Sequence, residues 1–309
     1  MRIFFAGTPK NAADSLLSLH QAGLDIVGVL TRNDAAIGRK HILTPSPVAV
    51  QATELGIKVI KSNSFDDSTI AQITELKADL GVVIAYGAFV NESGLKIFPN
   101  GWINVHYSLL PKYRGAAPVQ HAILNREEFT GVSIFQLDAG MDSGPLVTSV
   151  PTRIETDENS ARLLDRLTHL GISALLETIP SIAAGIAQYK QQPKEGSSFA
   201  PKISREDAEI NWAKSAIDLE AFINAMNPEP MAWTRWGEDT LRILSAREYQ
   251  GSSLGLGERQ VQLVDRSIVV GCRGSMIELL TVQPAGKNVM LARDWYNGQK
   301  DKGAVAFAE

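Results

Sequence analysis

The chain has 309 residues, 44% hydrophobic and 21% charged, which is ordinary for a globular protein and leaves room for a larger and a smaller domain. Its formal net charge of −4 excludes capture of nucleic acid by overall charge, so any RNA contact must be local. Cys272 is the only cysteine, which excludes an intramolecular disulfide and a cysteine zinc site and favours a reducing cytoplasm. Neither a signal peptide nor a membrane span is expected, because the apolar runs are too short for either.

The first half of the chain alternates apolar runs of strand length with segments of helical periodicity. Such alternation predicts a Rossmann-like α/β domain with a doubly wound, mostly parallel sheet. Ser46 and Pro47 supply an N-cap and a proline at the first helical position, so we expect a helix to begin there. The runs of strand length are residues 2–8, 25–32, 58–62, 79–87 and 101–109.

A basic segment, residues 32–41, lies between the second strand and the following helix. It contains Arg32, Arg39, Lys40 and His41, includes a glycine and has no apolar periodicity, so we expect a loop. A solvated surface loop is one interpretation. The other is a substrate contact, because loops that follow parallel strands lie at the edge where open α/β sheets bind ligands.

The second half of the chain changes character after two more predicted strands, residues 129–138 and 146–154, and a long helix from about Asp157 to Gly185. A polar, proline-containing segment follows and predicts a linker, with a domain boundary near Ser204. Beyond a helix at about 216–226, short alternating strands predict a smaller C-terminal β-barrel domain of the OB-like kind. The predicted division is 1–188 for the first domain, 189–205 for the linker and 206–309 for the second domain.

The most informative stretch is residues 104–118, NVHYSLLPKYRGAAP, at the end of a predicted strand. Strand alternation places Asn104 and His106 on the same face. An amide and an imidazole that point together can hydrogen-bond a carbonyl oxygen and transfer a proton. A buried, hydrogen-bonded histidine before an ordinary loop is the alternative interpretation of an Asn-x-His pattern.

A second stretch, residues 136–147 with the sequence QLDAGMDSGPLV, has two aspartates in a glycine-rich loop between two strands. Glycine lets the backbone approach a planar ligand closely and take up positive φ. Asp142 is the candidate carboxylate partner for His106, whose pKa it would raise and whose orientation it would fix. Taken alone, the loop is also typical of a turn with Asx hydrogen bonds.

Together, NVHYSLLPKYRGAAP and the later LDAGMDSGP resemble the folate-dependent formyltransferase family. The resemblance implies that Asn104, His106 and Asp142 are the catalytic residues, which transfer a formyl group directly from 10-formyltetrahydrofolate to an amine. It also implies folate contacts in three groups: Ile84, Ala85, Tyr86, Gly87, Ala88 and Phe89; Ser108, Leu109, Leu110 and Pro111; and Asp138 with Gly140.

Over essentially the whole chain the resemblance is to the branch of this family that formylates initiator methionyl-tRNA. FAGTP, TPSPV, VVIAYG, ISREDAEINW, NPEPMAW and LTVQPAGKNVM all recur there. The resemblance implies a cytoplasmic translation enzyme, and we expect a monomer. Arg39, Lys40 and His41 are the candidate tRNA contacts, although the basic cluster is less dense than in many relatives.

Several other functions are weighed against this one. FAGTP lacks a G-x-G-x-x-G continuation, so NAD is not expected, and the absence of metal-ligand motifs predicts no catalytic metal. The nearest alternative is a formyltransferase that acts on a nucleotide-linked amino sugar, and TPSPV and QPAGK argue against it. A formyltetrahydrofolate hydrolase would not explain the second domain, and a non-catalytic folate- or RNA-binding module would not explain all three catalytic-type residues.

Overall fold

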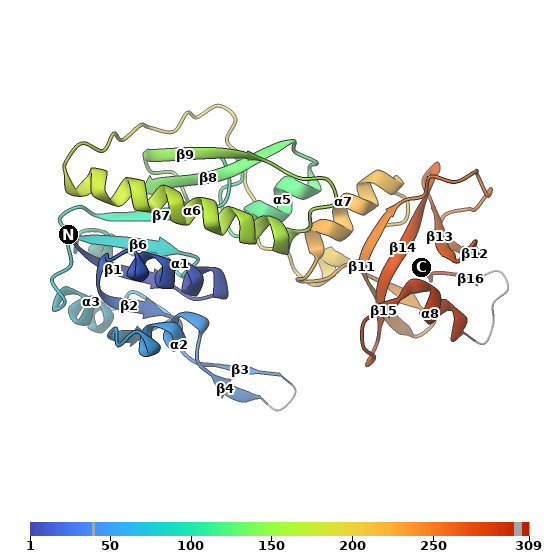
Figure 1. The fold of residues 1–309 in the computed structure, drawn as a ribbon, viewed down its shortest axis with the longest axis horizontal. Helices are drawn as coiled ribbons and strands as arrows, with labels where there is room; N and C mark the ends of the chain where they lie inside the picture. The colour runs from blue at the N-terminus through green and yellow to red at the C-terminus, as the bar shows by residue number, and fades with distance from the viewer. Residues whose placement is uncertain (39–40, 300–304, 309) are drawn as a thin grey trace. The chain divides into compact units, whose positions relative to one another are not determined.

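The computed structural model describes residues 1–38, 41–299 and 305–308. The chain forms two compact units (Figure 1). Unit 1 comprises Met1–Pro118, Phe129–Arg153 and Leu164–Ala200, and unit 2 comprises Val119–Glu128, Ile154–Leu163 and Pro201–Glu309. Among the described residues, no helix is both long and apolar enough to cross a membrane.

Unit 1 is built on a seven-stranded sheet with the order β5-β2-β1-β6-β7-β8-β9. The first five strands in this order are parallel, and β8 and β9 continue the sheet in antiparallel fashion. The predicted fold class, a Rossmann-like and mostly parallel sheet, is therefore confirmed. The strands are β1 (Arg2–Gly7), β2 (Asp25–Thr31), β5 (Val59–Lys61), β6 (Leu80–Ile84), β7 (Trp102–His106), β8 (Phe129–Gln136) and β9 (Leu146–Arg153).

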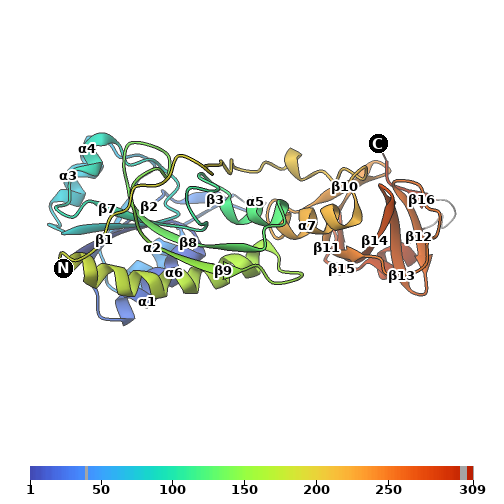
Figure 2. The ribbon, with the colours of Figure 1, turned by 90° about the horizontal axis from the view of Figure 1, so that it is seen from above.

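Helices cover both faces of this sheet. Figure 2 shows α1 and α6 on one side of it and α3 and α4 on the other. The hydroxyl of Ser46 accepts a hydrogen bond from the backbone of Ala49, which confirms the predicted helix N-cap. The helices of unit 1 are α1 (Lys10–Gln21), α2 (Pro47–Glu54), α3 (Asp67–Thr74), α4 (Glu92–Leu95) and most of α6 (Ser160–Ala183), whereas α5 (Pro118–Leu124) belongs mostly to unit 2.

The sheet face toward α3 carries an aromatic cluster. The ring of Trp102 lies 4.7 Å from that of Phe98 and 5.6 Å from that of Phe65, centroid to centroid. A Cβ on Gly81 would lie 2.2 Å from the Trp102 ring, so only glycine fits beside it on β6. Packing of this kind fixes the relative heights of β6 and β7, the two strands from which the predicted site residues follow.

The basic segment was predicted as a loop, and this prediction was wrong in part. Two short strands, β3 (Ala35–Ile37) and β4 (Ile42–Thr44), pair in antiparallel fashion as a hairpin. Strands of three residues are too short for alternation to be recognised in the sequence. The pattern of burial does not predict these strands either, because Ile37, Ile42 and Leu43 are mostly exposed rather than packed on a core.

Unit 2 contains the helix α7 (Ala216–Met226), at its predicted place, and an antiparallel sheet with the order β10-β11-β14-β13-β12-β16. The backbone of Ala308, just beyond β16, donates to the carbonyl oxygen of Arg235 in β10, so the sheet curls into a half-barrel. This confirms the predicted β-barrel class. The strands are β10 (Trp233–Trp236), β11 (Asp239–Glu248), β12 (Gln260–Val264), β13 (Ser267–Cys272), β14 (Ser275–Pro284), β15 (Met290–Leu291) and β16 (Val305–Ala306).

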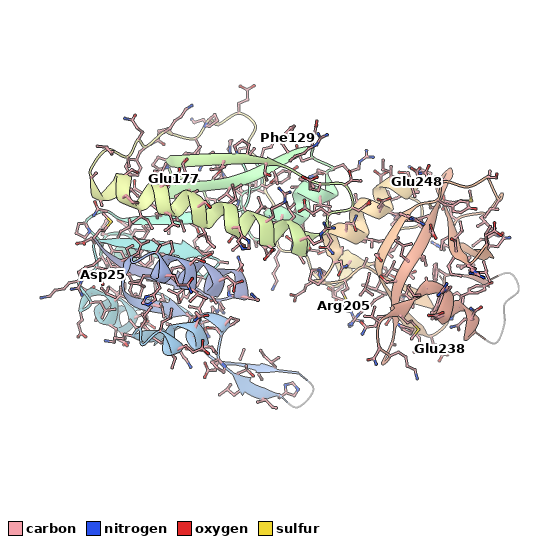
Figure 3. All side chains as sticks on the ribbon, in the orientation of Figure 1. Asp25, Phe129, Glu177, Arg205, Glu238 and Glu248 are labelled. Atoms are coloured by element: carbon pink, nitrogen blue, oxygen red, sulfur yellow. The ribbon has the colours of Figure 1, made fainter. Side chains whose placement is uncertain are left out.

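The half-barrel has a core of its own. Trp212 is buried, stacks on Phe307 and donates its indole N–H to the hydroxyl of Thr234. A short helix, α8 (Ala292–Asn297), which the sequence did not predict, adds the buried Trp295. By contrast, the charged residues Arg205 and Glu238 are exposed to solvent (Figure 3).

Candidate active site

The first group of predicted folate contacts, Ile84–Phe89, follows β6 at the switch point of the sheet. From β1 the chain moves outward to β2 and β5 and then returns to the other side of β1 as β6. Open α/β sheets bind ligands at such a point. Ala85 and Gly87 have φ of 48° and 87°, and residues 85, 87 and 89 are exposed, whereas Tyr86 is buried. Because alanine and glycine have little or no side chain, this exposure leaves the backbone of the segment accessible.

Tyr86 holds this segment in place. Its ring is buried in the aromatic cluster, its hydroxyl donates to the carbonyl oxygen of Ser62, and its own carbonyl accepts from the hydroxyl of Thr8. Burial raises the pKa of Tyr86 to about 12, so the hydroxyl stays a donor. The guanidinium of Arg32 donates to the next carbonyl, that of Gly87, at 2.6 Å. Any ligand contact of Tyr86 must therefore come from its backbone.

Asn104 and His106 lie on the same face of β7, as predicted from alternation. Val105 lies on the opposite face, toward α6. Asn104 pairs with Phe135 and His106 with Ser133 across β8, and the His106 ring meets Phe135 edge to face. Among the described residues, Oδ1 of Asn104 is buried without a hydrogen-bond partner. An unpaired buried acceptor costs about 1–3 kcal/mol, so a ligand that donates to it would bind favourably here.

The tautomer of His106 is fixed by one hydrogen bond. Its Nε2 lies 2.8 Å from the carbonyl oxygen of Tyr113. Because a carbonyl only accepts, the neutral imidazole must carry its proton on Nε2. Nδ1 is then the basic nitrogen, and it lies 3.7 Å from Oδ2 of Asp142.

The second group, Ser108–Pro111, forms the turn after β7. Ser108 is fully buried and its hydroxyl donates to the carbonyl oxygen of Lys112. On β8, Ser133 donates to the carbonyl oxygen of Ser108 and accepts from the backbone of Leu110. The two serine side chains therefore stabilise the turn, and Leu109 and Pro111 are its less buried residues.

The third group belongs to the loop between β8 and β9. The carboxylate of Asp138 accepts from the backbone of Gly140 and from the hydroxyl of Ser143, which is the Asx turn considered as the alternative. Asp142 behaves differently, because its carboxylate accepts from the backbone of Gly115 at 2.8 Å. Its φ is 49°, in the left-handed region. The loop thus begins beside Trp102, whose carbonyl accepts from Leu137, and reaches back to His106.

The pKa of His106 follows from two opposing causes. Burial lowers the pKa of the imidazole below its ordinary value, and the Asp142 carboxylate raises it by a smaller amount. The hydrogen bond to Tyr113 also raises this pKa, while the nearby Arg114 lowers it. Asp142 changes the pKa of His106 in the expected direction, but burial, which the interpretation of the sequence did not include, has the larger effect on this pKa. His106 is therefore neutral at neutral pH and has a free Nδ1 that can accept a proton.

Sequence reasoning missed a group of residues from the segment 189–200. The backbone of Arg114 donates to the carbonyl oxygen of Ser198, and the hydroxyl of Ser198 accepts from Tyr113. Gln192 hydrogen-bonds both Arg114 and the loop that carries Asp142. The signal in the sequence was only a polar segment with prolines, which also predicts a linker.

Comparison with known proteins identifies the class. The chain matches the family described as formyl transferase over residues 1–179 and that described as formyl transferase, C-terminal domain, over residues 202–300. The chain belongs to the formyl transferase family.

Two relatives match this chain over its full length or nearly so. A methionyl-tRNA formyltransferase of Renibacterium salmoninarum is 42% identical over 309 residues, which is 100% of both chains. One of Arthrobacter sp. is 40% identical over 99% of this chain and 100% of its own. Among solved structures, the sugar 3N-formyl transferase WlaRD, crystallised with dTDP and 5-N-formyl-THF, superposes with a TM-score of 0.68 at 19% identity. It covers 93% of this chain and 99% of its own, and this likeness shows the fold alone.

The residues of this site fit a folate. Among the residues that the structure describes, no group of three His, Cys, Asp or Glu could hold a metal ion. The unpaired Asn104 acceptor, the outward backbone at Ala85 and Gly87 and the glycine-rich loop at Gly140 are suited to a flat ligand rich in hydrogen-bond donors and acceptors.

Replacing Asp142 with Asn tests the pairing with His106. The substitution keeps the shape and removes the anion that raises the imidazole pKa, so the pKa of His106 should fall further below its ordinary value. An NMR titration of the full-length protein measures this. Asp138→Asn is the matched control, because the Asp138 carboxylate bonds only within its own loop. Equal His106 pKa values in the parent and in Asp142→Asn would contradict the pairing.

Proposed function

We propose that this protein transfers the formyl group of 10-formyltetrahydrofolate to the amino group of initiator methionyl-tRNA and so supplies formylmethionyl-tRNA for translation initiation. The observation that carries the proposal is the buried His106, whose basic Nδ1 faces Asp142 on the same strand face as Asn104, an amide whose Oδ1 has no partner among the described residues. Support for the acceptor comes from full-length relatives at about 40% identity that are named for methionyl-tRNA.

The chemistry follows from the protonation state of the three residues. The bound folate supplies an activated formyl carbon for attack by the amine. Neutral His106 accepts a proton from that amine through Nδ1, and the resulting imidazolium is stabilised by the Asp142 carboxylate 3.7 Å away. The Asn104 amide donates to the oxygen that becomes negative during attack. The imidazolium would return its proton to the departing folate nitrogen as the bond between that nitrogen and the formyl carbon breaks, so tetrahydrofolate would leave without a covalent bond to the protein.

The folate is proposed to bind along the three groups named from the sequence. Ile84–Phe89 would offer backbone donors and acceptors, the turn Ser108–Pro111 would bound the site, and Asp138 with Gly140 would close it. We further propose that residues 1–188 are the catalytic domain, that 189–205 join it to the next and that 206–309 support the tRNA. We assign the reaction to the cytoplasm and expect the protein to be a monomer. We propose no membrane partner, no metal and no NAD.

A nucleotide-linked amino sugar is the second candidate acceptor, because WlaRD shares the fold. The test offers the full-length protein 10-formyltetrahydrofolate with methionyl-tRNA, uncharged tRNA or a dTDP-linked amino sugar, each separately. Only methionyl-tRNA should become formylated. Formylation of the sugar alone would replace the proposed acceptor, and formylation of neither would contradict the proposed function.

Removing either Asn104 or His106 should slow turnover strongly. For Asn104→Ala we expect kcat to fall by about 10²-fold or more, the usual effect of losing one oxyanion donor. For His106→Ala we expect a loss of about 10²-fold or more, the usual contribution of a general base. Asn104→Ala breaks no hydrogen bond of the described residues, so its melting temperature should stay close to that of the parent. His169→Ala, an exposed histidine on α6, is the control. Rates within about threefold of the parent in both site variants would disprove these roles.

We also propose that Arg39, Lys40 and His41, which lie between β3 and β4 in the sequence, guide the acceptor end of the tRNA. Arg39 and Lys40 lie outside the described residues, whereas His41, next to them, is exposed with a φ of 48°. The hairpin follows β2 and so belongs to the carboxyl edge of the parallel strands. At its base, Arg32 bonds the segment proposed to hold the folate.

Charge reversal at Arg39 and Lys40 should impair the use of methionyl-tRNA and leave the use of the folate unchanged. Arg39→Glu with Lys40→Glu should raise KM for methionyl-tRNA and flatten its salt dependence, because each phosphate contact contributes roughly 0.9 to the logarithmic salt slope. Folate binding should be unchanged. Lys58→Glu with Lys77→Glu is the charge-matched control, because both residues are exposed and precede the amino ends of β5 and β6. An unchanged KM for methionyl-tRNA at every salt concentration would mean that Arg39 and Lys40 belong to a solvated surface loop that does not bind the tRNA.

A further inference from the structure

We propose that Gln192 is a positioning residue of the formyl-transfer site: its side-chain amide holds the loop 138–144 so that the Asp142 carboxylate stays against His106. This inference rests on the proposed function, and it assigns a role to the segment that the sequence predicted only as a linker.

Every polar atom of the Gln192 side chain is used. Its Nε2 donates to the carbonyl oxygen of Asp142 at 2.9 Å and to that of Gly144 at 2.8 Å. Its Oε1 accepts from Nη2 of Arg114 at 2.6 Å. One side chain therefore joins both loops of the site, because Arg114 directly follows Tyr113, whose carbonyl accepts from His106.

The loop needs support from outside. Met141 is exposed, and the hydrogen bonds within the loop, among the described residues, are those of Asp138 with Gly140 and Ser143. Asp142 adopts a φ of 49°, and a non-glycine residue in the left-handed region costs about 1–3 kcal/mol and persists only where its surroundings hold it. Among the described residues, its hydrogen bonds are those from Gln192 and from the backbone of Gly115.

Gln192 is itself placed by regular backbone pairing. Two residues earlier, Lys190 exchanges both backbone hydrogen bonds with Leu146 at the start of β9, at 2.7 and 2.8 Å. Farther along, Ala200 donates to the carbonyl oxygen of Arg114, beside Phe199. The amide of Gln192 is thus a fixed point against which the loop is positioned.

The arrangement separates the role of Gln192 from catalysis itself. Gln192 does not touch His106, and it holds the Asp142 backbone rather than the carboxylate. The charged groups that act on the His106 imidazole are Asp142 and Arg114, and Gln192 contacts both residues. Loss of Gln192 should therefore move two charges relative to His106 without removing either.

Three full-length variants test this assignment. Gln192→Ala removes all three hydrogen bonds. Gln192→Glu keeps an acceptor for Arg114 but turns an oxygen toward the two loop carbonyls. Gln191→Ala is the matched control, because Gln191 is exposed and makes no hydrogen bond within the described part of the chain. We expect kcat for methionyl-tRNA to fall by about 10- to 100-fold in both Gln192 variants, with KM within about twofold, since a displacement of about 1 Å is enough for this loss.

A double-mutant cycle separates positioning from a purely structural role. In the Asp142→Asn background, Gln192→Ala should lower kcat by no more than about twofold further, because residues that act through one group are not additive. Melting temperatures show that the variants are folded. Parental activity of Gln192→Glu, or losses from Gln192→Ala and Asp142→Asn that multiply, would overturn the proposal.

A readout that does not need turnover keeps the two proposals separate. The pKa of His106, measured by NMR titration, should fall in Gln192→Ala and stay parental in Gln191→Ala. A displaced Asp142 carboxylate raises this pKa less, and Asp142 has a larger effect on it than Arg114, which lowers it. If the parent fails to formylate methionyl-tRNA, the proposed function fails while this titration still tests the positioning. An unchanged His106 pKa in a folded Gln192→Ala variant overturns the positioning alone.

Discussion

The hydrogen bond between Nε2 of His106 and the carbonyl oxygen of Tyr113 is the interaction on which the site depends. It assigns the proton of the neutral imidazole to Nε2 and leaves Nδ1 as the base. It also sets the ring so that Nδ1 faces Asp142 at 3.7 Å. A ring turned by 180° would place the carbon Cδ2 where Nδ1 now faces Asp142, so this one contact decides whether His106 presents a basic nitrogen at this position.

Holding the Tyr113 carbonyl in place takes two distant parts of the chain. Ser133 on β8 fixes the start of the turn through Ser108 and Leu110, and Ser198 fixes its end through the backbone of Tyr113. The same segment that supplies Ser198 also contacts the Asp142 loop. The imidazole and its carboxylate are therefore positioned by one common framework, and a shift in the framework moves both partners together.

Burial gives this site its reactivity at a cost in stability. Removing His106 from water lowers its pKa more than Asp142 raises it, so the free protein has a neutral base rather than an ion pair. The same burial leaves an Asn104 acceptor without a partner in the described residues. An unpaired polar group of this kind is expected where a ligand supplies the missing partner, and Asn104 lies on the same face of β7 as His106.

The sequence by itself determined the fold class, the strands and helices with clear periodicity and the shared face of Asn104 and His106. It also proposed Asp142 as the carboxylate partner of His106. These follow from local patterns, since alternation on a strand decides which side chains point together. The tertiary structure alone decided the tautomer of His106, the dominance of burial over charge at its pKa, the β3–β4 hairpin and the contacts of Gln192. Each of these depends on groups that are far apart in the chain and meet only when the sheet, its turns and the segment 189–200 have packed together.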